Sequence, residues 1–165
     1  MRYECFSTSI SAKRASLTVL QLLCKEPKHR AMYLWEHPPA PTYVSGPLCV
    51  MGDAAHATTP WQGSGGGMSI EDSLILSTLL GRSTTPNDAL AALKAYDQVR
   101  RPRTQRIVES SRITGSILTG TSEETRQYVD TPGKLLSRWD FILDIGMEKH
   151  RDEAILTMEQ ELQVA

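Results

Sequence analysis

The sequence predicts an α/β fold that is mostly α-helical, with a few short strands and long C-terminal helices. One observation is a short apolar run, Leu48 to Met51, which ends at Gly52 and precedes a glycine-rich loop. Another is the apolar spacing of three and four residues that dominates the chain after residue 85. The order of strand, glycine loop and helix is typical of a site for an anion or a cofactor.

The first stretch of the chain predicts one helix, one strand and an extended connector. Residues Ser16 to Cys24 carry leucines at helical spacing, so we expect a short helix there. Met32 to Trp35 has the composition of a strand. The proline cluster Pro38 to Pro41 must be extended, because proline interrupts the hydrogen bonding of helices and central strands.

The second stretch contains the strand, the loop and the helix. The run Leu48 to Met51 is wholly apolar, which predicts a strand covered on both faces, with Cys49 as a small core residue. The glycine-rich loop Gly63 to Gly67 follows, and a helix is expected from about Met68 to Leu80. The acidic residues Glu71 and Asp72 are expected in the first turn of this helix. The apolar residues Ile75, Leu76 and Leu79 are expected to face a core.

The third stretch is predicted to be helical almost throughout. Thr85 and Pro86 form an N-cap and first-turn pair that starts a long helix. Pro102 should kink that helix or restart it. A further helix is expected from about Leu135 to Leu162, with an interruption near Gly146.

Composition narrows the functional classes. The chain has 165 residues, a net charge of −1 and 40% hydrophobic residues, which fits an ordinary soluble domain. This charge gives no reason to expect a nucleic acid or an anionic membrane as partner. No signal peptide or membrane span is recognisable, so a cytoplasmic location is expected. The 3 cysteines and 4 histidines lack the spacing of zinc sites, and we therefore expect no metal site.

The segment from Gly52 to Gly67 has the residue types that a cofactor site needs. Gly52 lets the chain turn sharply off the strand. Asp53 then follows the carboxyl end of that strand, where ligands bind in open α/β sheets, and its carboxylate can accept hydrogen bonds from hydroxyl groups. Gly65 to Gly67 can present bare N–H groups at the start of a helix, which favours negative charge.

These residues form a specific pattern, G-D-A-A-H-x-x-x-P-x-x-G-x-G-x-x-x-x-x-E-D, which runs from Gly52 to Asp72. It resembles the second flavin fingerprint of class A FAD-dependent monooxygenases, in particular their salicylate hydroxylase-like branch. The segments Pro38 to Gly46 and Ala95 to Arg103 are similar to the same branch. The resemblance implies that the fold is a remnant of a FAD/NAD(P)-binding Rossmann-like domain.

The resemblance also implies roles by position. Asp53 would bind the ribityl chain of FAD, and the amides of Gly65, Gly66 and Gly67 would face the pyrimidine edge of the flavin. Pro60 would lie near the flavin face and Trp61 near the flavin or the substrate. The remaining implied cofactor contacts are Gly52, Gln62 and Gly63. NAD(P)H would serve as co-substrate, and an aromatic small molecule would be hydroxylated with O2.

Two features depart from the family pattern. Trp61 stands where members of this branch often have histidine, which makes the substrate-facing side more apolar. The first glycine of the chain is Gly46, so the G-x-G-x-x-G motif that grips the FAD pyrophosphate does not precede it. We therefore expect that the ADP-binding half is absent. The expected organisation is the end of a substrate domain with its connector (1–46), half of a FAD-binding domain (47–125) and a helical tail (126–165).

Several alternatives remain open from the sequence. Asp53 alone could be an ordinary turn residue, and His56 is expected to be a structural hydrogen-bonding group rather than a base. The arginines of the 100–103 segment are expected to be solvated or paired with carboxylates. The chain as a whole could be a non-catalytic truncated homologue, or a subunit that needs a second chain before it binds FAD. A homo-oligomer or a complementing chain is thus an expected partner.

Overall fold

The structure is a computed structural model, and it describes residues 33–122 and 132–164. The described residues from Leu34 onward belong to one compact unit, whereas Tyr33 belongs to a separate unit, Met1–Tyr33. The helix expected at Ser16 to Cys24 lies outside the described residues. Residues 33–35, which were expected to form a strand, adopt no regular secondary structure.

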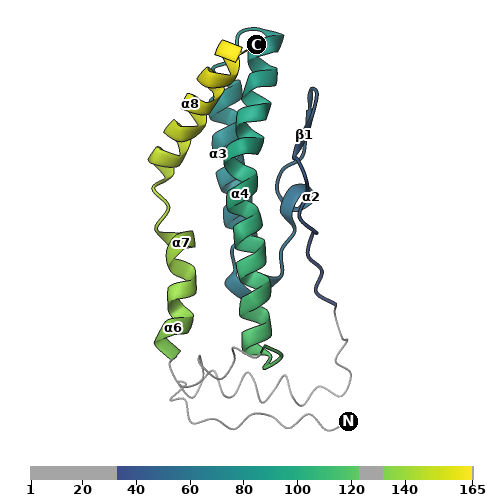
Figure 1. The fold of residues 1–165 in the computed structure, drawn as a ribbon, viewed down its shortest axis with the longest axis vertical. Coiled ribbons are helices and arrows are strands. Elements are labelled where there is room, and N and C mark those ends of the chain that lie inside the picture. Colours follow the sequence, from purple (N-terminus) through teal and green to yellow (C-terminus); the bar gives the residue numbers. More distant parts are fainter. Residues whose placement is uncertain (1–32, 123–131, 165) are drawn as a thin grey trace. The chain divides into compact units, whose positions relative to one another are not determined.

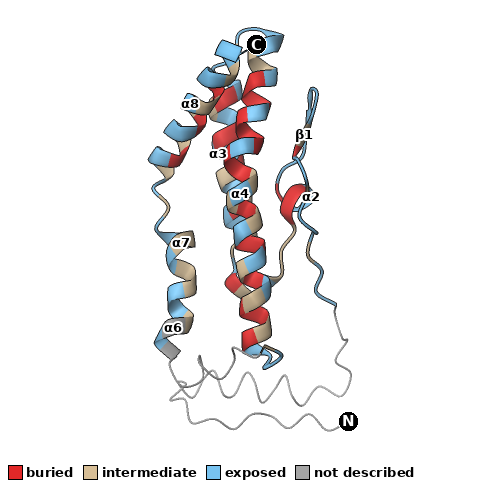
Figure 2. Ribbon diagram, in the orientation of Figure 1, coloured by how far each residue is buried: buried red, intermediate tan, exposed pale blue. Residues whose placement is uncertain are grey.

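The core of the larger unit is helical. Helices α3 (Gly65–Leu80), α4 (Pro86–Leu118) and α8 (Met147–Val164) pack against one another, as Figure 1 shows. Figure 2 shows buried residues along the length of α4 and further buried residues on α3 and α8. The three core residues predicted on α3 are confirmed, since Ile75, Leu76 and Leu79 are all buried.

Helix α4 begins as predicted. Thr85 is its N-cap and Pro86 its first residue, and Thr85 and Asp88 form a reciprocal capping box. Of the two outcomes predicted at Pro102, the restart is wrong, because α4 continues through this proline as one helix of 33 residues, and the kink stays a prediction. Burial of Val99 and Ile107 on either side of Pro102 explains the continuity, since packing outweighs the loss of one backbone hydrogen bond.

The predicted buried strand is wrong in its extent and its burial. Strand β1 (Val44–Ser45) pairs antiparallel with β2 (Leu48–Cys49) in a short two-stranded hairpin. Leu48 is 71% exposed, and Val50, Met51 and Cys49 are exposed as well. No other strand is found in residues 33–122 and 132–164, so in the described structure these apolar side chains have no sheet to cover them.

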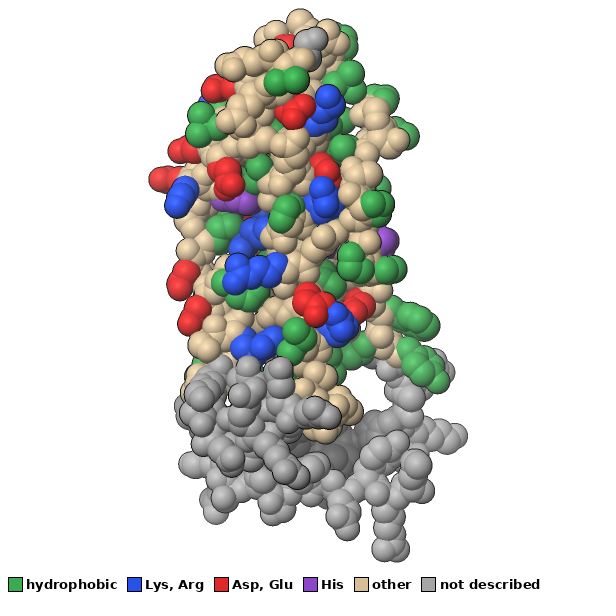
Figure 3. Space-filling view, in the orientation of Figure 1, with side chains coloured by type: hydrophobic (Ala, Val, Ile, Leu, Met, Phe, Trp, Pro, Cys, Tyr) green, Lys and Arg blue, Asp and Glu red, His purple; other side chains and the backbone are tan. Residues whose placement is uncertain are grey.

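The C-terminal stretch is divided more finely than predicted. It consists of α6 (Pro132–Leu136), the 3-10 helix η2 (Ser137–Trp139), α7 (Asp140–Leu143) and then α8. The expected interruption near Gly146 is confirmed. On the face drawn in Figure 3, acidic and basic side chains lie close together among apolar ones. Within the described ranges, no helix is both long enough and apolar enough to span a bilayer.

Candidate functional site

Gly52 forms the sharp turn that the sequence predicts. Its φ of 58° and ψ of −144° lie in a region that other residues rarely adopt. A Cβ at this position would approach Ser69 Oγ to 3.1 Å. The backbone N–H of Gly52 donates to Asp72 Oδ2 at 3.0 Å. A side chain of α3 therefore holds the turn in place. The short helix α2 (Asp53–His56) starts immediately after the turn.

The glycine loop is shorter than predicted, because helix α3 starts at Gly65 rather than at Met68. Gly63 has a left-handed φ of 65° and ends the 3-10 helix η1 (Pro60–Gln62). Ser64 is the N-cap of α3, but its side chain makes no capping hydrogen bond. Gly65, Gly66 and Gly67 thus form the first turn of a 16-residue helix, whose first N–H groups have no partner within the helix.

A groove of about 630 Å³ runs over this helix start and the turn that follows Gly52. We call it the flavin-turn groove. It brings together five of the predicted site residues, Asp53, Pro60, Gly63, Gly65 and Gly66. The other residues that line it are Thr58, Thr59, Ser64 and Ser69. An exposed carboxylate and a helix N-terminus therefore border the same groove, which combines hydrogen-bond acceptors with donors.

Four predicted site residues do not line the flavin-turn groove: Gly52, whose turn precedes it, and Trp61, Gln62 and Gly67. Gly67 and Gln62 line a neighbouring hollow of about 300 Å³. The buried Gln62 donates from its side-chain Nε2 to the backbone carbonyl of Arg138 at 3.0 Å, and the backbone carbonyl of Gln62 accepts from Trp139 Nε1 at 3.1 Å. Trp61 packs against Gly115 of α4, where any Cβ would overlap its indole ring. Gln62 and Trp61 thus attach the loop to neighbouring helices.

Asp72 is the buried centre on which the turn depends. Its carboxylate accepts hydrogen bonds from the Gly52 N–H at 3.0 Å, from His56 Nε2 at 2.7 Å and from Arg100 Nε at 2.8 Å. Burial acts to raise the pKa of Asp72, but the hydrogen bonds from His56, Gly52 and Arg100 together hold it below its ordinary value. Asp72 is therefore ionised, and His56 is confirmed as a structural hydrogen-bonding group.

Glu71 extends this arrangement toward α4. It accepts from Arg100 Nη1 at 2.7 Å and from Arg103 Nε at 2.8 Å. Burial acts to raise the pKa of Glu71. The hydrogen bond with Arg103 and the charge of Arg100 outweigh this effect, so the pKa of Glu71 lies below its ordinary value. Arg100 is fully buried and also donates to His150 and to the carbonyl of Met68. We call Glu71, Asp72, Arg100, Arg103 and His150 the buried ion network.

The buried ion network corrects one prediction and confirms another. Glu71 and Asp72 were expected in the first turn of α3, but the earlier start of the helix places them in its second turn. Their role is to pair with arginines rather than to interact with the helix N-terminus. The expected pairing of the arginine segment is confirmed, since Arg101 also contacts Asp97 at 2.9 Å. The signal in the sequence was the pairing of an acidic E-D with a basic R-R-x-R segment.

Comparison with known proteins identifies the family. The sequence profile of a FAD binding domain matches residues 4–111, which is more than half of the chain. This chain belongs to the class A FAD-dependent monooxygenase family. FAD is therefore the cofactor whose shape and chemistry the groove has to match. The mostly helical structure represents part of a FAD-binding domain fold.

Three relatives support the assignment. The chain is 53% identical over 94 residues to a 6-methylsalicylate 1-monooxygenase of Aspergillus terreus, which covers 57% of this chain and 20% of the relative. It is 32% identical over 174 residues to a FAD-dependent monooxygenase of Hypocrea jecorina, with 90% and 38% covered. A solved salicylate hydroxylase–substrate complex superposes with a TM-score of 0.66 at 34% identity, covering 70% of this chain and 29% of that one. The chain thus spans well under half the length of these relatives.

The described residues fit part of a FAD molecule. Gly63, Gly66 and Gly67 have open space where a Cβ would stand, so a planar group can approach the backbone there. The adjoining carboxylate of Asp53 suits polyol hydroxyls. Among residues 33–122 and 132–164, no group of three or more His, Cys, Asp or Glu residues could hold a metal ion.

Proposed function

We propose that this chain forms the part of a FAD-dependent monooxygenase that holds the ribityl chain and the pyrimidine edge of the flavin. The observation that carries the proposal is the placement of Asp53 and the N-terminus of α3 on one groove. Asp53 would accept hydrogen bonds from ribityl hydroxyls. The N–H groups of Gly65 and Gly66 would face the flavin edge that becomes negative on reduction. The positive end of the helix dipole would stabilise the same negative charge.

The remaining residues of the groove would orient the cofactor. Pro60 would form a rigid wall near the flavin face, because its ring fixes the backbone at the start of η1. Gly52, held by Asp72, would keep Asp53 at the mouth of the groove. When bound, the flavin supplies the redox and oxygen chemistry, and the protein supplies binding, orientation and electrostatics.

We propose further that the complete activity uses NAD(P)H and O2 to hydroxylate an aromatic or related small molecule. The support is the similarity to a protein named 6-methylsalicylate 1-monooxygenase and to a salicylate hydroxylase structure. The fold would accordingly be the second half of a Rossmann-like FAD-binding domain. Gln62, Gly63 and Gly67 would support the loop, and Trp61 would steady it against α4 while remaining close to the substrate side.

A second candidate function is that of a subunit or non-catalytic homologue that binds FAD only with a complementing chain. The exposed apolar side chains of Leu48, Val50 and Met51 favour it, because such a surface is suited to cover by a partner or by a second copy. The partner would supply the strands and the pyrophosphate grip that complete the cofactor site.

The first test is a titration of the purified chain with FAD, followed by quenching of flavin fluorescence. We expect saturable binding that Asp53→Asn weakens by about tenfold, which is typical of losing a hydrogen bond to a charged group. Asp144→Asn is the matched control, because Asp144 is also exposed but lies in the segment between α7 and α8. The control should bind FAD like the unchanged chain.

The outcomes separate the two candidates. Binding by the chain alone that depends on Asp53 supports the first. Binding that appears only after an ADP-binding half is added, and still depends on Asp53, supports the second. Equal FAD affinity of Asp53→Asn and Asp144→Asn would contradict the role given to the groove in both.

A further inference from the structure

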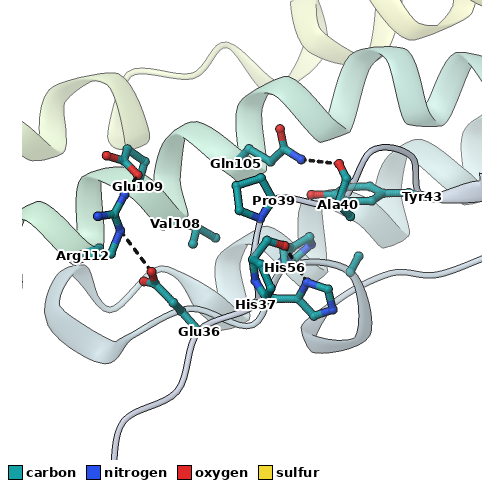
Figure 4. A pocket seen from close by; sticks show the side chains of 12 residues that line it. Glu36, His37, Pro39, Ala40, Tyr43, His56, Gln105, Val108, Glu109 and Arg112 are labelled. Carbon is teal, nitrogen blue, oxygen red and sulfur yellow. Dashed lines mark hydrogen bonds and ion pairs between the residues drawn. The ribbon is translucent and has the colours of Figure 1, made fainter.

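A second pocket lies between the proline-rich connector, α2 and α4 (Figure 4). Its volume is about 280 Å³, and none of the residues that line it lines the flavin-turn groove. We call it the connector pocket. The side chains that matter for its chemistry belong to Glu36, Pro39, His56, Val108, Glu109 and Arg112.

His56 presents a buried acceptor to the connector pocket. Its Nε2 lies 2.7 Å from Asp72 Oδ2, and because Asp72 is ionised, this nitrogen carries the hydrogen. In the tautomer that carries its hydrogen on Nε2, Nδ1 is an acceptor. His56 is only 2% exposed, and within the part of the chain that the structure describes Nδ1 has no hydrogen-bond partner. A buried polar atom of this kind favours a ligand that donates to it.

Glu36 presents a second buried acceptor from the connector. Its Oε1 pairs with Arg112 Nε at 3.0 Å, whereas Oε2 is buried and has no partner among the described residues. Glu109 also lines the pocket, so two carboxylates oppose one guanidinium. The excess of negative charge favours a cationic donor at this end.

Apolar groups form the walls between these two acceptors. Pro39, Ala40 and Val108 line the pocket, together with Tyr43 and Ala55. The volume, about 280 Å³, lies just below the usual range for small-molecule sites, roughly 300–1,000 Å³. A molecule with a single ring therefore fits, whereas a dinucleotide does not.

We propose that the connector pocket binds a small aralkylamine with a hydroxyl group on its ring. The protonated amine would donate to Glu36 Oε2, and the hydroxyl would donate to His56 Nδ1. The ring would lie between Pro39 and Val108. This site is separate from the flavin-turn groove, and the proposal does not depend on whether the chain binds FAD.

The test uses the full chain and tyramine (4-hydroxyphenethylamine) as the probe, with binding measured by calorimetry and by changes in backbone amide NMR signals. Two analogues isolate the two ends. Phenethylamine lacks the hydroxyl and should bind about fivefold more weakly, while 4-hydroxyphenylacetate replaces the cation by an anion and should bind at least about tenfold more weakly. Equal affinity for tyramine and the acid would overturn the proposal, as would the absence of tyramine binding.

Variants locate the site. Glu36→Gln should reduce tyramine affinity about tenfold, whereas the matched control Glu159→Gln, on the exposed face of α8, should leave it unchanged. Val108→Phe should fill the pocket and abolish binding while thermal unfolding remains cooperative. Tyramine binding that survives both Glu36→Gln and Val108→Phe would place the ligand elsewhere and contradict the proposal.

Discussion

Two aspartates on either side of the same turn have opposite environments. Asp53 is exposed and borders an open groove, whereas Asp72 is fully buried and accepts hydrogen bonds from three groups. The first environment leaves a carboxylate available to a ligand. The second uses a carboxylate to fix the backbone at Gly52. One turn thus combines an accessible carboxylate, for which we propose a role in binding the flavin, with a buried carboxylate that fixes the backbone.

The largest effect is expected where the buried ion network loses its central cation. Arg100→Met leaves Glu71 and Asp72 buried without their common partner, so we expect a loss of about 3–5 kcal/mol of unfolding free energy. Urea unfolding followed by circular dichroism measures it. Arg112→Met is the control, because its ion pairs are at the surface and should contribute about 1 kcal/mol or less. Similar losses in both variants would refute the contrast between buried and exposed pairs.

The next effect concerns the turn that joins the two aspartates. Gly52→Ala introduces a Cβ at a positive φ and at 3.1 Å from Ser69 Oγ, so we expect a loss of about 1–3 kcal/mol. The same variant should weaken FAD binding, because Asp53 follows directly. If stability fell while FAD affinity stayed the same, the turn at Gly52 would not position Asp53 for the flavin.

A smaller effect of opposite sign is expected in the first turn of α3. Gly66→Ala should raise stability by about 0.5–1 kcal/mol, since nothing lies within 4 Å of the added methyl and alanine favours helix. It should reduce FAD affinity, because the methyl group enters the flavin-turn groove. Gly133→Ala in α6 is the matched control, with open space around it and no effect expected on FAD. Unchanged FAD affinity of Gly66→Ala would separate this helix start from the cofactor.

The smallest effect concerns pH. Burial and the adjacent charge of Arg100 lower the pKa of His150 below its ordinary value of 6.5. The folded state thus favours the neutral ring, and the unfolded state takes up a proton first. The contribution of His150 to the free energy of unfolding is present above about pH 6.5. It is lost as the pH falls through that value toward the pKa of His150 in the folded state. His150→Gln should flatten the stability profile in this window, and an unchanged slope would contradict the role of this contact.

Much of the fold follows from local sequence patterns. The start of α4 at Thr85 and Pro86, the core residues of α3 and the break near Gly146 were predictable, because caps and apolar periodicity act within a few residues. The strand predicted at Leu48 to Met51 was wrong in its extent and its burial, since an apolar run shows only that a surface is suited to burial. Whether such a surface is buried depends on what packs against it.

The sequence by itself determined the family and the motif from Gly52 to Asp72, because the residue types and their spacing are specific. Tertiary structure decided which of those residues share a groove. It placed Asp53 beside Gly65 and Gly66, turned Trp61 and Gln62 toward neighbouring helices, and gave Asp72 its partners. The physical reason is that hydrogen bonds and ion pairs between distant segments depend on how the helices pack, which no local pattern encodes.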